Sequence, residues 1–212
     1  MQTDLIIFSL IVLIFSAILH EVAHGYMADH LGDPTARLMG RLTLNPLPHL
    51  DPVGSIILPL LLKITGSPIL IGYAKPVPYN PNNLPGKYDE TLVAAAGPAT
   101  NLAIALVFGL IVRFGAAAMT PTLLQAFAVI VYLNLLLGFF NLIPIPPLDG
   151  SKVLSGILPR PLAHSYDLFR RNFERLGLLP LVLLLLFFFY ALSPAVTPFL
   201  SWIFQGLTGM SL

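Results

Sequence analysis

The chain has 212 residues, of which 56% are hydrophobic and 10% are charged, against the roughly 25% charged residues typical of soluble domains. This composition excludes an ordinary soluble domain and indicates a membrane protein. The formal net charge of +1 gives no electrostatic case for nucleic-acid binding, and the lack of cysteine excludes disulfides, thiolate metal ligands and a cysteine nucleophile.

Four stretches of the chain are apolar enough to form helices across a membrane, which takes about 20 residues. They span about residues 5–27, 91–112, 122–143 and 177–207. We therefore predict an all-α polytopic membrane protein, a single domain over residues 1–212, with a three-helix core and a C-terminal helix. Pro194 could break the last stretch into a helical hairpin, because proline interrupts a helix.

Residues 54–72 are also apolar, but prolines, a lysine and a glycine interrupt them. Irregular backbone is tolerated at membrane depth only where it is packed inside protein or lines a wet cavity. We therefore predict a short re-entrant or β-strand insertion within about residues 41–79, between the first two core helices.

The basic residues indicate which side of the membrane the loops occupy. Ten of the eleven lie in two loops, five in residues 28–90 and five in residues 150–176. If residues 54–72 do not cross the membrane, both loops lie on one side, which the positive-inside rule makes cytoplasmic. We expect a multi-pass protein of the cell membrane whose first and third core helices both end at the cytoplasmic face.

A His-Glu-x-x-His sequence, His20-Glu21-Val22-Ala23-His24, lies near the end of the first predicted helix. Histidines four residues apart lie one turn apart on the same helix face, so both can bind one metal ion. Imidazole suits zinc, whose catalytic sites combine three protein ligands with a water, and Glu21 is placed to act as a general base toward that water. The alternative of a chance pattern is disfavoured, because ionisable side chains in apolar spans are costly. The sequence predicts a zinc-dependent peptidase.

Asp149 is the strongest candidate for a third ligand. It follows three prolines, at positions 144, 146 and 147, that end the third predicted helix and disfavour helical backbone before them. Because the first and third helices run in the same direction, Asp149 and His24 would reach the same membrane face. The alternative is that Asp149-Gly150 forms a simple turn.

Other third ligands are weaker candidates. His30 has the spacing of the third histidine of metzincins, but Met27 stands where that motif has its glycine. A glutamate ligand would define another class of membrane metalloprotease, and Glu90 and Glu174 are the two glutamates besides Glu21. Neither lies in a recognisable motif.

Three motifs occur in order along the chain: His20-Glu21-x-x-His24, Gly97-Pro98-Ala99-Thr100-Asn101, and the run from Asn141 to Leu148-Asp149-Gly150. Over about residues 5–155 the chain resembles the site-2 protease family of intramembrane zinc metalloproteases, peptidase family M50. It looks like a compact form, without room for PDZ or CBS domains.

The resemblance implies a role for each motif. The implied Zn²⁺ ligands are His20, His24 and Asp149. Glu21 would be the catalytic acid and base, and Asn101 would help to hold the substrate peptide or stabilise the oxyanion. A bond from Asn101 to a neighbouring helix is an equal alternative.

The resemblance also implies the function, an endopeptidase that cleaves membrane proteins in or near their transmembrane helices, within the lipid bilayer. A strand edge in the insertion could bind an unwound substrate as an added strand. The run from Asn45 to Gly54 also resembles a segment of compact family members. Its His49 and Asp51 would shape a loop or, less favoured, bind metal. The non-enzymatic alternative is a zinc-binding membrane scaffold or transporter, but such a protein has no need of Glu21 beside the ligands.

Overall fold

The computed structural model describes residues 2–51, 75–177, 187 and 193–211. These residues form helices and turns, with no strand among them. The long helices are α1 (Gln2–His30), α4 (Asp89–Gly115) and α5 (Pro121–Asn141), and the shorter ones are α2 (Thr35–Leu38), α6 (Asp149–Ile157), α7 (Arg160–Glu174) and α9 (Ser193–Thr208). Short 3₁₀ turns cover Leu47–His49, Pro81–Asn83 and Ala116–Ala118.

Three of the described helices are long and apolar enough to span a membrane, namely Asp4–His30, Asp89–Ala118 and Pro121–Asn141. They confirm the three predicted core helices and extend the first two at both ends. Each has exposed apolar residues, as Ile6, Phe114 and Leu123 illustrate with exposed fractions of 60%, 81% and 43%. Lipid is the natural solvent for such surfaces, and the protein is therefore an all-α membrane protein.

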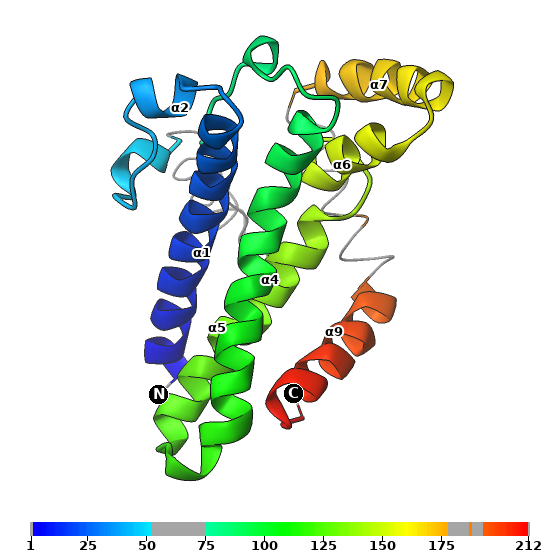
Figure 1. The fold of residues 1–212 in the computed structure, drawn as a ribbon. Coiled ribbons are helices and arrows are strands. Elements are labelled where there is room, and N and C mark those ends of the chain that lie inside the picture. Colours follow the sequence, from blue (N-terminus) through cyan, green and yellow to red (C-terminus); the bar gives the residue numbers. More distant parts are fainter. Residues whose placement is uncertain (1, 52–74, 178–186, 188–192, 212) are drawn as a thin grey trace.

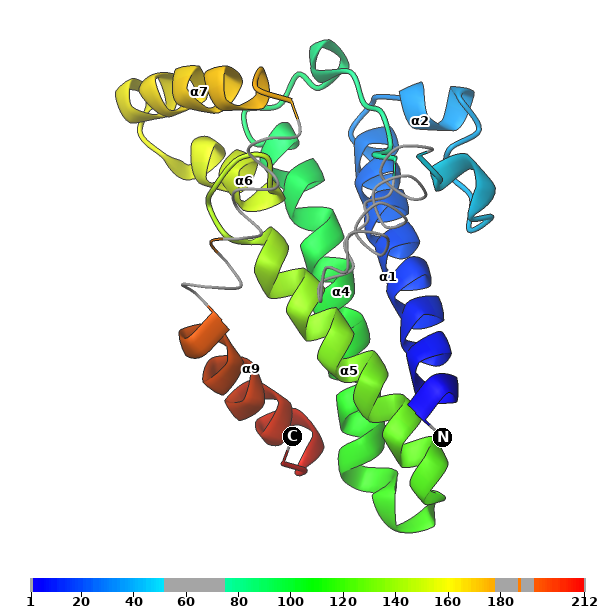
Figure 2. The same cartoon turned by 180° about the vertical axis from the view of Figure 1, so that it is seen from behind.

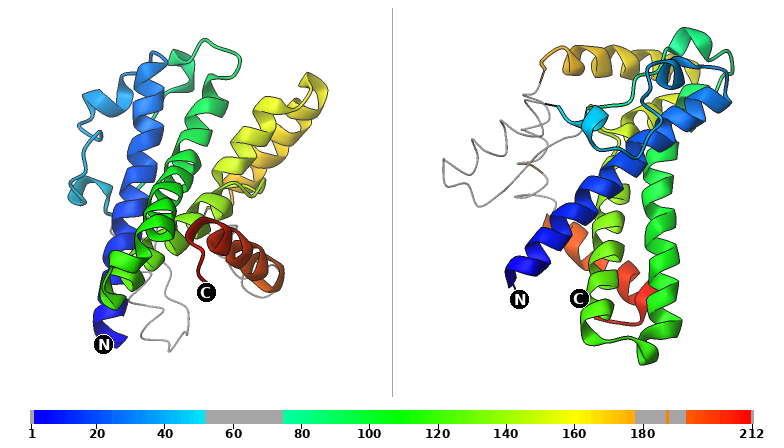
Figure 3. Two further views of the ribbon diagram at one scale, coloured as in Figure 1. Left: turned by 60° about the horizontal axis from the view of Figure 1, so that its bottom comes forward. Right: turned by 90° about the vertical axis from the view of Figure 1, so that its left-hand side faces the viewer.

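The core helices run side by side, with α4 antiparallel to α1 and α5 (Figures 1 and 2). Figure 3 shows α1 inclined to the other two and α7 lying across the end of the bundle. The chain turns back at Thr120, whose side chain accepts a hydrogen bond from the N–H of Leu123 and so caps α5. The alternating directions bring the end of α1, the start of α4 and the end of α5 together.

The predicted C-terminal segment, 177–207, is described only in part. α9 begins at Ser193, beside the proline at which we predicted a break, and packs Leu200 and Phe204 against Ala105 of α4 and Val131 and Leu135 of α5. The preceding part of the segment lies outside the described residues.

The insertion between α1 and α4 is described at its two ends. The backbone N–H of Lys75 donates to the carbonyl of His49 at 2.8 Å, so these two ends lie side by side. Arg41, 6% exposed, donates to the Lys75 carbonyl at 2.9 Å. The strands or re-entrant element predicted for residues 54–72 lie outside the described residues.

Asp33 fixes the chain that follows this insertion. Its side chain has no exposed surface and accepts bonds from the backbone N–H of Asn80 at 2.6 Å and from the amide of Asn83 at 2.7 Å. Thr35 donates to the same carboxylate from its backbone and its hydroxyl. These bonds hold residues 75–84 against the end of α1 that carries the His-Glu-x-x-His sequence.

Candidate metal centre and active site

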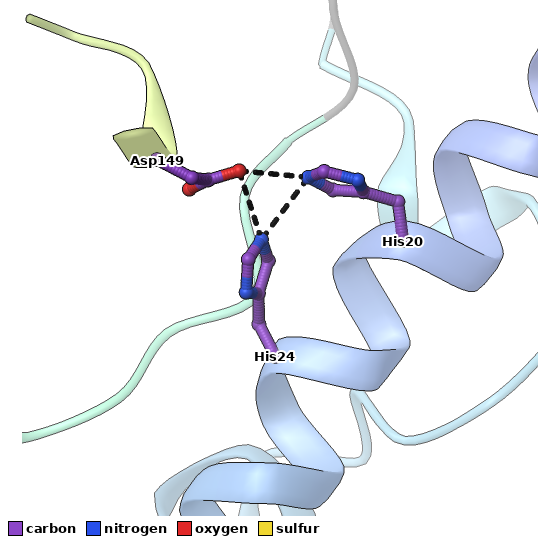
Figure 4. Close-up of side chains that lie close together, drawn as sticks. All are labelled: His20, His24 and Asp149. Atoms are coloured by element: carbon purple, nitrogen blue, oxygen red, sulfur yellow. Dashed lines mark hydrogen bonds and ion pairs between the residues drawn. The ribbon is translucent and has the colours of Figure 1, made fainter. Parts of the chain in front are cut away.

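His20, His24 and Asp149 meet where α1, α4 and the start of α6 come together (Figure 4). The Nε2 atoms of the two histidines lie 3.1 Å apart. Oδ2 of Asp149 lies 2.9 Å from Nε2 of His20 and 3.3 Å from Nε2 of His24. The structure therefore brings together the three predicted ligands, although 129 residues separate His20 from Asp149.

The helix geometry explains the placement of each ligand. His20 and His24 lie one turn apart on α1, as their spacing requires. α5 ends at Asn141, before the prolines, and Asp149 is the first residue of α6. A Cβ on Gly150 would lie 2.2 Å from the carbonyl oxygen of Leu142, so only glycine lets α6 start this close to the end of α5.

A second glycine allows α4 to approach the two imidazoles. A Cβ on Gly97 would lie 2.4 Å from Nε2 of His24 and 2.6 Å from Nε2 of His20. Any larger residue at position 97 would collide with these nitrogen atoms, which explains why a glycine occupies this position of α4. Pro98 also has no N–H for the carbonyl of Ala94, a residue of the adjoining cavity.

The Nδ1 atoms of both histidines form hydrogen bonds with groups outside the ligand cluster. Nδ1 of His24 lies 2.6 Å from the carbonyl of Val93, which can only accept, so this nitrogen carries a hydrogen. Nδ1 of His20 lies 2.6 Å from Oδ1 of Asn101. In both rings Nε2 is the atom that faces the centre.

The charge of the cluster fits a metal ion. Burial alone would raise the pKa of Asp149, but the hydrogen bonds and charges of the two imidazoles outweigh it and hold that pKa well below its ordinary value. An ionised oxygen and two ring nitrogens at this spacing need positive charge among them, as protons on the rings or as a cation. Ligands of tetrahedral zinc, with bonds of about 2.0–2.2 Å, lie roughly 3.3–3.5 Å apart. The observed separations of 2.9, 3.1 and 3.3 Å are at or slightly below this range, so the three ligands need to spread only slightly to bind the ion.

Glu21 lies beside this cluster, on a cavity of about 350 Å³ that the two histidines and Asp149 also line. Its Oε2 accepts a hydrogen bond of 2.8 Å from the backbone N–H of Val77. The segment that Asp33 and Arg41 hold in place therefore orients the predicted base. Pro76, Tyr79, Asn141 and Lys152 line other parts of the same cavity.

The remaining sequence candidates lie elsewhere. Asn101 has no exposed surface and is not among the residues that line the cavity. Its predicted contact with substrate stays a prediction. The contacts that the structure shows are with His20 and Ser16 of α1 and Asn134 of α5, which confirms the alternative of a bond to a neighbouring helix. His30 lines a separate surface groove, and His49 is buried in a loop, with Nε2 donating to the carbonyl of Thr43 at 2.9 Å, as the loop interpretation expected.

Several groups at the site were missed. Asn134 and Ser16 bond to Asn101, and a lone asparagine in an apolar span was a usable signal, because such residues are costly there. Asn141 was recognised within its motif but given no role. The Val77 N–H and Val93 carbonyl are backbone groups, so no residue type could have indicated them.

The fold and the site together define a membrane zinc metalloprotease, and comparison with known proteins gives the family. The model of peptidase family M50 matches residues 109–186. YwhC of Bacillus subtilis, named as a zinc metalloprotease, is 41% identical over 157 residues, which cover 70% of this chain and 68% of that protein. The chain belongs to peptidase family M50, the site-2 protease family, and Zn²⁺ is its cofactor.

Two further relatives carry the same description in their names. Rip2 of Mycolicibacterium smegmatis is 34% identical over 142 residues, 66% of this chain and 53% of that protein. MJ0611 of Methanocaldococcus jannaschii is 40% identical over 62 residues, 29% of this chain and 31% of that protein. The match thus spans about half the length of Rip2. No solved structure matches the chain significantly.

Proposed function

We propose that this metalloprotease is an intramembrane endopeptidase that hydrolyses peptide bonds in or near the transmembrane helices of other membrane proteins. The observation that carries the proposal is the depth of the site. His20 lies ten residues before the end of α1, about 15 Å along the helix axis. Large apolar residues are exposed on both sides of that level along the same helix, with Phe15 before it and Tyr26 after it. A peptide bond that reaches the site must therefore enter the membrane.

The residues proposed to hold zinc are His20, His24 and Asp149. Zinc, when bound, supplies a Lewis acid that polarises the scissile carbonyl and makes hydroxide available near neutral pH. The chain supplies the proton transfer: Glu21 takes a proton from the attacking water and passes it to the leaving amine nitrogen. Because one Glu21 oxygen is held by the Val77 N–H, the other can carry that proton.

The same proposal requires an unwound substrate. A transmembrane helix hides its carbonyl groups in hydrogen bonds between successive turns. Its backbone can reach the cavity only after local unwinding, so glycine or proline near the cleavage point favours cleavage. The partners are thus the lipid bilayer and membrane proteins with a helix that unwinds at this depth.

The decisive experiment is cleavage of a labelled transmembrane substrate by the purified protein in liposomes, with zinc content measured in parallel. Glu21→Gln should lower the cleavage rate about 10²–10⁴-fold, the usual contribution of a general base, while zinc content stays unchanged. Glu90→Gln is the matched control, since Glu90 lines a different pocket. Cleavage by Glu21→Gln at the wild-type rate would reject the mechanism.

We also propose that the site lies near the cytoplasmic face of the cell membrane. The described basic residues except Arg113 lie in the segments at the α2, α6 and α7 end of the bundle, and the positive-inside rule assigns this end to the cytoplasm. The native chain has no cysteine, so single reporters are free of background. In intact cells an impermeant maleimide should label Ala118→Cys and spare Arg171→Cys; the opposite pattern would invert the topology.

A further inference from the structure

A buried polar cluster connects α1, α4 and α5 next to the metal centre. Ser16, Asn101 and Asn134 are exposed to 4%, 0% and 0%. Polar side chains in an apolar environment cost free energy unless they are hydrogen-bonded, and inside a membrane they generally mark a functional site. Because Asn101 also contacts His20, this cluster ends on a proposed zinc ligand.

Backbone carbonyl groups determine which way the Asn134 amide points. The carbonyl of Ile130 can only accept, so the Asn134 atom 2.9 Å from it is the NH₂ group. The same NH₂ donates to the hydroxyl of Ser16 at 2.9 Å. The amide oxygen of Asn134 is therefore the atom that faces Asn101.

The orientation of Asn101 follows from that of Asn134. The NH₂ of Asn101 donates to the Asn134 oxygen at 2.9 Å and to the carbonyl of Ser16 at 3.3 Å. Its own oxygen is then left for His20, 2.6 Å from Nδ1, and an oxygen that only accepts requires a hydrogen on that nitrogen. A neutral imidazole with its hydrogen on Nδ1 has its lone pair on Nε2, the atom that faces Asp149.

We infer that Asn101 is a positioning residue of the zinc site, and that Asn134 and Ser16 hold its amide in the orientation that fixes the tautomer and ring plane of His20. The inference rests on the proposed ligand role of His20. Loss of the outer hydrogen-bond partner of a metal-bound histidine typically lowers metal affinity about 10–100-fold. Asn101 thus acts on the metal through His20, without touching the substrate.

Metal binding by the full-length protein in detergent tests the inference independently of peptidase activity. Zinc affinity is measured by competition with a chromophoric chelator, and the visible spectrum of the Co²⁺-loaded protein reports ligand geometry. Asn101→Leu should weaken zinc binding about 10–100-fold and alter the Co²⁺ spectrum. Asn101→Asp keeps an acceptor for Nδ1 of His20 and should bind zinc more tightly than Asn101→Leu.

Two further comparisons test whether the cluster acts as a unit. Asn134→Leu should weaken zinc binding less than Asn101→Leu, and the double variant should match Asn101→Leu alone, because Asn134 acts through Asn101. Ser16→Ala should also weaken zinc binding. Ser9→Ala is its matched control, since the Ser9 hydroxyl bonds the carbonyl of Leu5 in its own helix, away from the site.

Wild-type zinc affinity and Co²⁺ spectrum in both Asn101→Leu and Asn134→Leu would overturn the inference. A raised KM for a transmembrane substrate with unchanged zinc affinity would instead assign Asn101 to substrate binding. If Asn101→Leu does not fold, Asn134→Leu and Ser16→Ala measured against Ser9→Ala decide the question, and equal affinities reject the role. A wild-type protein that binds zinc but cleaves no membrane substrate would refute the proposed function and leave these measurements valid.

Discussion

Asp33 and Asp149 are two carboxylates withdrawn from solvent at the same end of the bundle, and their neighbours differ in kind. Asp33 accepts hydrogen bonds from N–H and O–H donors of Thr35, Asn80 and Asn83. Asp149 faces the ring nitrogens of His20 and His24, which are themselves metal ligands by type. Burial of a carboxylate therefore does not identify a functional site; the chemistry of the groups around it does.

The largest expected contrast is in metal content. Asp149→Ala removes a proposed ligand and should lower zinc affinity by more than the roughly 10–100-fold typical of outer hydrogen-bond partners, with cleavage activity lost in parallel. Asp33→Ala should retain stoichiometric zinc. Metal analysis after dialysis against a weak chelator measures both. Equal zinc retention by the two variants would remove the distinction between these carboxylates.

A smaller loss of zinc affinity is expected from crowding the two histidines that face Asp149. Gly97→Ala places a methyl group 2.4 Å from Nε2 of His24, so α4 or the ring has to move. Because overpacking typically costs about 1–3 kcal/mol, we expect zinc affinity to fall roughly 10-fold. Gly206→Ala in α9 is the matched control, because no atom of the described residues lies within 4 Å of its added Cβ. Chelator competition on both proteins checks the prediction. Unchanged zinc affinity in Gly97→Ala would show that α4 moves away from the histidines without disturbing the site.

For substitution of Asp33 the expected effect is on the stability of the fold. Asp33→Ala leaves buried donors without an acceptor, at about 1–3 kcal/mol for each group that finds no other partner. Thermal unfolding in detergent should show a lower Tm than wild type. Arg37→Ala removes a side chain that is 65% exposed and pairs with Asp29 at 3.2 Å, so its Tm should change little. A Tm for Asp33→Ala equal to that of Arg37→Ala would show that the Asp33 hydrogen bonds do not stabilise the fold.

The smallest effect concerns pH. Burial acts to raise the pKa of Asp33, but hydrogen bonds from Thr35, Asn83 and the N–H of Asn80 outweigh it and lower that pKa. The folded state then binds fewer protons than the unfolded state. Asp33 stabilises the fold fully above its ordinary pKa of about 4, and this contribution is lost as the pH falls through the lowered value.

Thermal unfolding over a pH series measures this contribution of Asp33 to stability. Between about pH 5 and pH 3 the Tm of wild type should fall more steeply than that of Asp33→Asn, which has no carboxyl group to titrate at this position. Parallel curves would show that other carboxyl groups control the acid limit.

The core helices and the grouping of the three proposed ligands were predictable because their signals are local or strongly constrained. An apolar run of about 20 residues has few alternatives to a membrane helix, and the spacing of His20 and His24 fixes their common face. Asp149 required a topological argument as well, since its proximity depends on α1 and α5 running in the same direction. That proximity is confirmed by its 2.9 Å distance to His20.

The parts that were missed depend on tertiary contacts or on weaker periodic signals. α7 was not predicted, although Leu162, Tyr166, Phe169 and Phe173 recur at helical spacing within a segment that we treated as a loop. Nothing in the sequence indicated that Val77 would bond Glu21, because every residue except proline has a backbone N–H. The direction of the Asn101 amide follows from carbonyl groups on two other helices, which only the assembled bundle places.

The distance along the chain between the two histidines and Asp149 has a consequence for biosynthesis. During translation α1 and α4 are complete before the segment that carries Asp149 is made. A growing chain therefore holds two imidazoles and a base without the carboxylate that completes the centre. The proposed zinc site is therefore complete only once α5 has taken its place and α6 has started.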